Sequence, residues 1–172
     1  ARKSFVNLGL GLFETLICWT KPIRLLNKQK LELIGKENLD KAKQLNKGCI
    51  IMSGHMTSLE FMPILLSSYG EFDFVYRPHE NNAINKAMIN GRKRFNHDVI
   101  SRNNMRQMLR SLKNKRRVVY LLDQDMGRPH SHFIPFFNIP TITLTTMYRI
   151  SKQTDSVIIP AMFYRDKSGK YF

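Results

Sequence analysis

The segment from residue 49 to residue 60 constrains the fold more than any other part of the sequence. Four apolar residues, Cys49–Met52, form a run that is short enough for a strand covered on both faces. Gly54, a residue that tolerates unusual backbone angles, ends the run, and His55 follows it. His55 is therefore expected at the carboxyl end of a strand, where open α/β sheets bind their ligands.

A helix is expected to begin just after this histidine. Residues 57–60 match a capping box, in which Thr57 is the N-cap and Glu60 reaches back to it. With His55 on the turn and Glu60 in the first helical turn, the imidazole and the carboxylate converge. Such a pair suits deprotonation of a hydroxyl that attacks an acyl carbonyl. The alternative is that Glu60 only caps the helix and His55 is an ordinary turn residue.

The rest of the chain alternates between short apolar runs and amphipathic segments. The runs predict strands at 31–34, 72–76, 99–100, 118–122 and 156–164, and the amphipathic segments predict helices at 4–19, 37–45, 61–69, 82–95, 104–113 and 143–152. Residues 133–137 are expected to form an apolar loop. The alternation predicts one α/β domain over residues 1–172, with a mixed, mostly parallel sheet flanked by helices.

Basic residues dominate the charge, which is formally +15. Residues 86–117 alone hold eleven Lys or Arg and one acid, Asp98. Such a block favours a phosphate-bearing or acidic partner: nucleic acid, anionic lipid headgroups or an acidic carrier protein. Aromatic residues are not interleaved with these charges, apart from Phe95, and no helix-turn-helix or zinc-finger pattern is present. The sequence therefore argues against a nucleic-acid-binding protein.

Other polar side chains follow the predicted strands. Arg77 directly follows one strand and could hold a phosphate in a bidentate manner, or it could be a surface residue paired with Glu80. Asp123 and Asp125 follow another strand and could bind a metal or orient a substrate. With no third acid nearby, loop ordering or hydrogen bonds to arginine are favoured, and no metal is expected.

Three further features have two interpretations each. His130 and His132 could form a metal-binding pair, but two solvated loop histidines are favoured. The aromatic residues within 133–137 would be core in most proteins, but beside a catalytic mouth they could wall a groove for an acyl chain. Residues 4–19 are too short and polar for a confident membrane span, and predict an amphipathic helix on the core or in a membrane interface.

Cys18 and Cys49, both in apolar runs, indicate a reducing compartment.

Several motifs occur together in a recognisable order. They are residues 5–15 (FVNLGLGLFET), 35–39 (GKENL), 53–60 (SGHMTSLE), 75–78 (VYRP), 122–127 (LDQDMG) and 133–137 (FIPFF). Over nearly the whole chain this order resembles the lipid A biosynthesis (lauroyl/myristoyl) acyltransferases, within the lysophospholipid acyltransferase superfamily. The resemblance implies a glycerol-3-phosphate-acyltransferase-like fold. Because members of that family carry a membrane anchor before this region and run longer after it, the chain is expected to be a partial acyltransferase domain.

The resemblance also implies a function in lipopolysaccharide biosynthesis. Family members work at the cytoplasmic face of the bacterial inner membrane and move a fatty acyl chain from acyl carrier protein, or from coenzyme A, to a hydroxyl of a Kdo-bearing lipid A precursor. No cofactor is implied. His55 would be the general base and Glu60 its partner. The substrate-binding residues would be Arg77, Arg92, Arg94, Asp123, Gln124, Asp125, Gly127 and Phe136, although Arg92 and Arg94 also fit solvated or lipid-facing positions.

Two alternatives stay open at this point. The first is an acyl-CoA-dependent acyltransferase that modifies another glycolipid or a lysophospholipid, because acceptor choice depends on the shape of the groove. The second is a basic, non-enzymatic peripheral membrane-binding protein, in which His55 and Glu60 would be structural. Binding to an anionic membrane is expected under either enzyme or non-enzyme interpretation.

Overall fold

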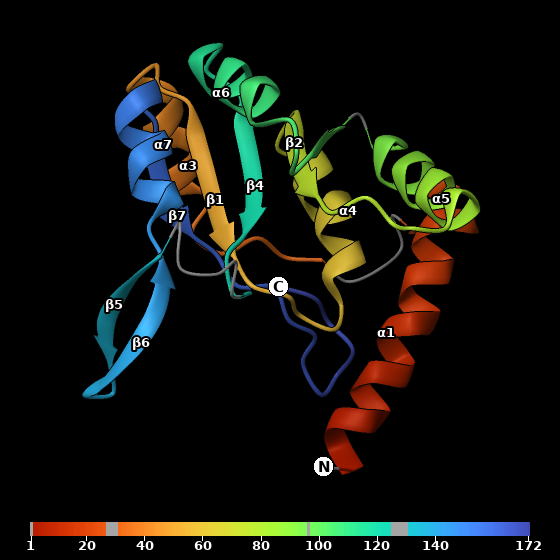
Figure 1. Ribbon diagram of the computed structural model, residues 1–172. Coiled ribbons are helices and arrows are strands. Elements are labelled where there is room, and N and C mark those ends of the chain that lie inside the picture. Colours follow the sequence, from red (N-terminus) through yellow and green to blue (C-terminus); the bar gives the residue numbers. More distant parts are fainter. Residues whose placement is uncertain (1, 27–30, 96, 125–130) are drawn as a thin grey trace.

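A five-stranded parallel sheet forms the centre of the protein (Figure 1). The computed structural model describes residues 2–26, 31–95, 97–124 and 131–172. The strand order is β3-β2-β4-β1-β7. The strands are β1 (Cys49–Ser53), β2 (Phe72–Tyr76), β3 (Asp98–Ser101), β4 (Arg117–Leu121) and β7 (Val157–Pro160). The predicted α/β class is confirmed, and this sheet is parallel throughout rather than mixed.

Helices cover both faces of the sheet. They are α1 (Arg2–Thr20), α2 (Ile23–Leu26), α3 (Glu37–Gln44), the short 3₁₀ helix η1 (Leu59–Phe61), α4 (Met62–Ser67), α5 (Asn82–Lys93), α6 (Met105–Lys113) and α7 (Thr146–Thr154). A separate antiparallel hairpin consists of β5 (Ser131–Phe136) and β6 (Ile139–Leu144). Most helix bounds agree with the prediction to within a few residues.

The core has two layers because successive residues of a strand point to opposite faces. Cys49 and Ile51 of β1 pack with residues of α3 and α4 on one face. Ile50, between them, packs on the other face with Met108 of α6 and Ile150 of α7. A strand buried on both faces explains why β1 is a continuous apolar run rather than an alternating one.

The connections after β1 and β4, which are neighbours in the sheet, leave toward opposite faces. The chain after β1 enters α4 on the first face, and the chain after β4 reaches α7 on the second. Adjacent parallel strands whose connections diverge in this way leave a crevice at their carboxyl ends. The arrangement of the sheet therefore places a potential ligand site between the ends of β1 and β4.

Three local predictions were wrong. Residues 31–34 form no strand and contribute only an isolated bridge between Leu31 and Tyr171. Residues 133–137 are not a loop, since Phe133 to Phe136 belong to strand β5. The predicted capping box does not form: the turn continues into η1, whose N-cap makes no side-chain hydrogen bond. The regular helix α4 starts only where Pro63 occupies its first turn, a position that favours proline.

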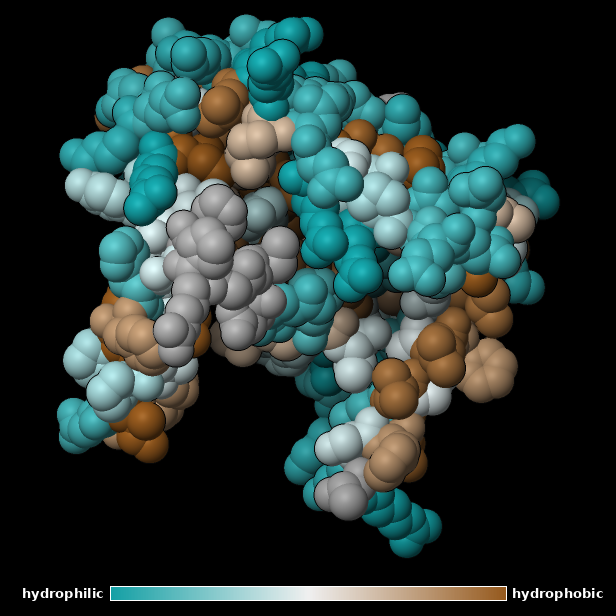
Figure 2. Space-filling model, viewed as in Figure 1, coloured by the Kyte–Doolittle hydropathy of each residue, from teal (hydrophilic) through white to brown (hydrophobic). Residues whose placement is uncertain are grey.

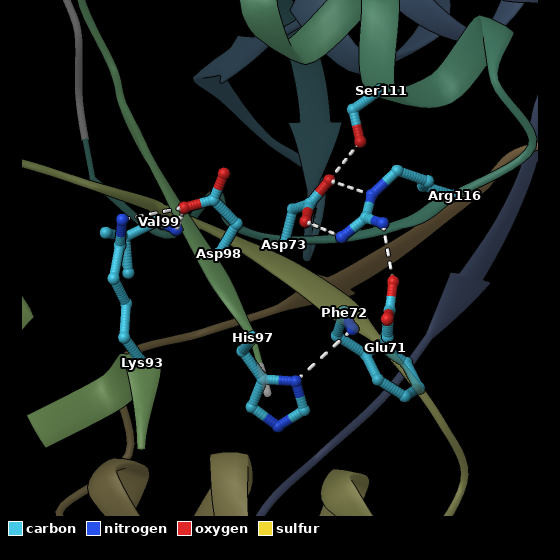
Figure 3. A network of polar contacts seen from close by, with 9 residues as sticks. All are labelled: Glu71, Phe72, Asp73, Lys93, His97, Asp98, Val99, Ser111 and Arg116. Atoms are coloured by element: carbon cyan, nitrogen blue, oxygen red, sulfur yellow. Dashed lines mark hydrogen bonds and ion pairs between the residues drawn. The ribbon is translucent and has the colours of Figure 1, made fainter. Parts of the chain in front are cut away.

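A polar network links β2 to α6 and to the residue before β4, near the amino ends of the strands (Figure 3). The carboxylate of Asp73, which is buried, accepts hydrogen bonds from Ser111 and from the Arg116 guanidinium. Nearby, the Nδ1 atom of buried His97 accepts the backbone N–H of Phe72. Part of the basic block at 86–117 is therefore used inside the fold rather than on partners.

Two apolar surfaces lie on the outside. One is a face of α1, and the other is the hairpin (Figure 2). In the part of the chain that the structure describes, no helix is long and apolar enough to cross a membrane. The prediction of an amphipathic helix at 4–19 is confirmed, because Glu14 and Cys18 are buried while Phe5 and Leu12 are largely exposed.

Candidate active site

His55 and Asp123 meet in the crevice between β1 and β4. The Nδ1 atom of the His55 ring lies 2.6 Å from Oδ1 of Asp123. The backbone N–H of His55 donates to the other carboxylate oxygen, Oδ2, at 2.7 Å. One carboxylate therefore binds both the backbone and the ring of the histidine. The other ring nitrogen, Nε2, takes no part in this contact.

Strand register explains why these two residues meet. In the parallel pair β1–β4, Ser53 lies opposite Leu121. His55 and Asp123 each lie two residues beyond these positions, so they occupy equivalent places past the carboxyl ends of their strands. Gly54 contributes as well, because a Cβ at this position would lie 3.2 Å from Oδ2 of Asp123. A residue with a side chain here would crowd the carboxylate.

The electrostatics favour an ionised aspartate. Partial burial by itself raises the pKa of Asp123, but hydrogen bonds from the backbone and ring of His55 outweigh it and hold the pKa below its ordinary value. Both side chains are about half exposed, 46% for His55 and 45% for Asp123. Water and substrate can therefore reach the pair, and the carboxylate remains available to stabilise an imidazolium.

Glu60 does not partner His55, contrary to the sequence-based prediction. Its carboxylate accepts a hydrogen bond from Nε1 of Trp19 at 3.0 Å. It also accepts two from the guanidinium of Arg92, at 2.5 and 3.2 Å. Glu60 therefore ties the turn after His55 to α1, through Trp19, and to α5, through Arg92. The physical reason is the 3₁₀ geometry of η1, which replaces the expected capping turn.

A cavity of about 200 Å³ opens next to the histidine. Its polar lining consists of His55, Tyr76, Arg77, Arg92, Arg102, Tyr120 and Gln124, and its apolar walls consist of Leu59, Val75, Met88, Leu121 and Leu144. The residue types fit a substrate with an anionic group and an apolar part. Among the described residues, no Asp or Glu lines this cavity.

Two arginines lie at equivalent positions beyond the ends of neighbouring strands, again because of strand register. Tyr76 lies opposite Ser101 in the pair β2–β3, so Arg77 and Arg102 each lie one residue beyond the end of their strands. Neither guanidinium has an ion-pair partner among the residues that the structure describes. Unpaired guanidinium groups are suited to bidentate binding of a phosphate.

The remaining predicted site residues separate into three groups. Arg92 and Gln124 line the cavity with His55. Arg94 does not; its guanidinium donates to the backbone carbonyls of Cys18 and Lys21 and so caps the end of α1. Phe136 is 63% exposed on the hairpin and does not line the cavity. Asp125 and Gly127 lie outside the described residues.

Metal binding was not expected from the sequence. His132 is exposed on the hairpin, and His130 lies outside the described residues. Within the ranges that the structure describes, no group of three or more His, Cys, Asp or Glu is placed to hold a metal ion. Cys18 and Cys49 are both buried free thiols.

Arg102 and Tyr120 were not predicted as site residues, and Asp123, for which loop ordering or hydrogen bonds to arginine were expected, binds the backbone and ring of His55 instead. Arg102 could have been recognised, because it follows a strand in the same way as Arg77. Tyr120 lies inside the strand predicted at 118–122, and no local signal marks it as lining a cavity. The pairing of Asp123 with His55 depends on two segments 68 residues apart in the chain.

Comparisons with known proteins give a consistent result. The model of the family described as "Bacterial lipid A biosynthesis acyltransferase" matches residues 1–172. The chain is 31% identical over 170 residues to a lipid A biosynthesis palmitoleoyltransferase of Escherichia coli (strain K12), covering 97% of this chain and 55% of the relative. It is 28% identical over 169 residues to a lipid A biosynthesis lauroyltransferase of the same organism, covering 98% and 55%.

A third relative, a lipid A biosynthesis acyltransferase of Haemophilus influenzae, is 29% identical over 167 residues, which cover 95% of this chain and 52% of the relative. The chain therefore spans about half the length of the curated relatives it matches.

Proposed function

Because the chain belongs to the family of bacterial lipid A biosynthesis acyltransferases, we propose that it transfers a fatty acyl chain to a hydroxyl of a lipid A precursor, with His55 as the general base. The observation that carries the proposal is the double hydrogen bond between His55 and Asp123 at the mouth of the cavity. A histidine oriented by a carboxylate, with its other ring nitrogen available, is the arrangement that activates a hydroxyl nucleophile.

The reaction is an acyl transfer from a thioester. His55 takes the proton from the acceptor hydroxyl at Nε2 while the oxygen attacks the thioester carbonyl. A tetrahedral intermediate forms, its carbon–sulfur bond breaks, and the new carbon–oxygen ester bond remains. The imidazolium returns the proton to the departing thiolate. Histidine thus acts first as a base and then as an acid.

Asp123 acts as a positioning residue in this scheme. Its contact with Nδ1 selects the tautomer in which Nε2 can accept a proton, and its negative charge stabilises the imidazolium. Glu60 is a second positioning residue, which acts through the turn. By binding Trp19 and Arg92, it holds the backbone between β1 and α4 in the conformation that presents His55.

Arg77 and Arg102 are proposed to bind the phosphate of a substrate. Both line the cavity with His55. A phosphorylated acceptor and a donor with a phosphopantetheine arm would each bring an anionic group to the mouth. Positive groups near the reacting carbonyl also stabilise the oxyanion that develops in the transition state.

The donor and the location are finer parts of the proposal. We infer that the donor is acyl carrier protein or coenzyme A, and that the reaction takes place at the cytoplasmic face of a bacterial inner membrane. The basic character of the chain, with a formal charge of +15, is complementary to an acidic carrier protein and to anionic lipid. The names of the relatives support lipid A as the acceptor class.

The test is a transfer assay with the full-length protein and a Kdo-bearing lipid A precursor. Labelled acyl chains are supplied on acyl carrier protein in one arm and on coenzyme A in the other. We expect folded His55→Ala to lose activity by orders of magnitude with either donor. Full activity in this variant would exclude the general-base role. Wild-type transfer only to a lysophospholipid would move the assignment to a different acceptor.

A further inference from the structure

The hairpin and α1 both project beyond the carboxyl ends of the sheet strands (Figure 1), and each carries an uncovered apolar surface. The hairpin surface consists of Phe133, Ile134, Phe136, Phe137 and Ile139, whose exposed fractions range from 43% to 85%. The α1 stripe consists of Phe5, Leu8, Leu12, Phe13 and Leu16, with exposed fractions from 55% to 73%. Figure 2 shows brown, apolar residues gathered on both projections.

The exposure and composition of the hairpin are those of a surface that binds a partner outside the described residues. Every residue from 132 to 141 is exposed, and residues 131–144 contain no Asp, Glu, Lys or Arg. A two-stranded ribbon of this kind, without a core to pack on, is only marginally stable in water. Exposed apolar groups of this density usually mark a site of interaction with protein or membrane.

The turn of the hairpin supports the same conclusion. Phe137 and Asn138 have φ angles of 49° and 62°, which places both in the left-handed region. Asparagine adopts this conformation readily, but it is unfavourable for a bulky residue such as phenylalanine. Phe137 is also 85% exposed. Neither the local backbone nor packing in the described structure therefore accounts for a phenylalanine at the tip.

Two prolines argue for lipid as the occupant rather than a second copy of the chain. Pro135 and Pro140 lie opposite each other in the ribbon. Proline lacks a backbone N–H, so it opposes the addition of another strand at an edge. The same lack reduces the number of unpaired donors that would enter an apolar environment.

The charges around α1 are complementary to acidic lipid. Arg2 and Lys3 precede the stripe, and Lys21 follows the helix. Glu14, the only acid of α1, faces the opposite side, where it is buried and accepts a hydrogen bond from Tyr171. An apolar face flanked by cations, with no exposed acid, is typical of a helix that lies in the interface of an anionic bilayer.

We propose that the hairpin surface and the α1 stripe insert together into one bilayer leaflet that contains acidic phospholipid. The crevice with His55 and Asp123 opens between these two contacts and faces the leaflet. An acceptor that is itself a lipid then reaches the base without leaving the membrane; this last step rests on the proposed function, whereas the docking itself does not.

Site-specific labels test the docking directly. An environment-sensitive dye is attached to Phe137→Cys, to Leu12→Cys and to Leu45→Cys in the full-length protein. The native thiols Cys18 and Cys49 are each 1% exposed and are protected from labelling. Leu45, which is 59% exposed before the amino end of β1, is the matched control. The vesicles contain phosphatidylethanolamine with or without phosphatidylglycerol.

With phosphatidylglycerol present, we expect dye emission at positions 137 and 12 to rise severalfold and shift to shorter wavelength, and emission at position 45 to stay unchanged. Replacement of Phe137 and Ile139 by serine should lower the vesicle partition coefficient about tenfold or more. Unchanged emission at position 137 on vesicles that bind the protein would overturn the proposal. A lipid-independent change accompanied by a doubled mass would assign the surface to a second copy instead.

The experiment is repeated with His55→Ala. Because docking needs no turnover, the dye response should persist in this inactive variant. Transfer that persists in His55→Ala together with an intact dye response would count against the proposed function alone. An absent dye response in a protein that still transfers acyl chains would count against the docking alone.

Discussion

Asp123 binds His55 with both of its carboxylate oxygens, one at the backbone N–H and one at the imidazole Nδ1. Two contacts to one residue define the position of the residue as well as the orientation of its ring. The carboxylate follows β4 and the histidine follows β1, so the geometry of the pair depends on the register of two adjacent parallel strands. This relationship leads to the first of five predictions.

The substitution Asp123→Asn should lower kcat by roughly 100-fold or more while KM changes little, because the amide cannot stabilise an imidazolium and is free to favour the wrong tautomer. Steady-state kinetics with the acyl donor varied will measure both constants. Asp155→Asn is the matched control, since Asp155 pairs with Lys47 at the surface and its left-handed backbone tolerates asparagine. A kcat equal to that of the control would remove Asp123 from the mechanism.

The substitution Glu60→Gln should destabilise the protein. The Glu60–Arg92 pair is mostly buried, with 12% and 14% of the side chains exposed, so loss of one charge leaves the other poorly compensated. We expect a loss of about 2–4 kcal/mol in the free energy of unfolding, measured by urea denaturation.

Glu71→Gln is the control for this variant. It breaks the exposed pair with Arg116, for which a change below about 1 kcal/mol is expected. If Glu60→Gln were as stable as the control and yet inactive, Glu60 would have a direct chemical role rather than a positioning role.

Two glycines of α1 provide a matched pair. A Cβ at Gly11 would lie 2.4 Å from the carbonyl oxygen of Thr57, in the turn that follows His55, whereas a Cβ at Gly9 would meet no atom within 4 Å. Gly11→Ala should therefore lower the free energy of unfolding by about 1–3 kcal/mol and reduce activity. Gly9→Ala should be neutral or stabilise the helix by roughly 0.5–1 kcal/mol. Thermal denaturation of both variants measures the difference; equal stability would mean that α1 does not pack on the turn that follows His55.

Arg77 and Arg102 should affect substrate binding more than turnover. Replacing either by glutamine removes charge-assisted hydrogen bonds, so KM for the phosphorylated substrate should rise about tenfold or more with a smaller change in kcat. Arg110→Gln, an exposed arginine of α6 within the same basic block, is the control. An equal rise in KM for all three variants would indicate a general charge effect rather than a site.

His97 should make stability depend on pH. Burial lowers the pKa of His97 below its ordinary value of 6.5, and its ring is held neutral between the Phe72 backbone N–H and the Pro63 carbonyl. The unfolded chain therefore binds the proton more readily. The stabilising contribution is fully present above pH 6.5 and is lost as the pH falls toward the folded-state pKa.

Urea midpoints measured at about pH 7.5 and about pH 5.5 will test this linkage. The decrease between these values should shrink in His97→Gln and persist in His79→Gln, since His79 is exposed. A decrease that is the same in His97→Gln as in the wild type would assign the acid sensitivity to other groups.

Local sequence patterns determined much of this protein. The apolar runs at Cys49–Met52 and Phe72–Tyr76 were long enough to be strands and too short to be buried helices, and both are strands. Gly54 and His55 follow the first run after one residue, Ser53, so their place at a carboxyl end of the sheet needed no long-range information. The amphipathic helix at residues 4–19 was evident from the spacing of its apolar residues.

The tertiary structure alone decided which groups meet. Asp123 reaches His55 because Ser53 and Leu121 are in register, and this register depends on strand order rather than on either segment. Glu60 is five residues from His55 in sequence, yet η1 directs it to Trp19 and Arg92. Local patterns encode burial and backbone preference over a few residues, whereas a pair of side chains that follow two different strands meets only when the whole sheet assembles.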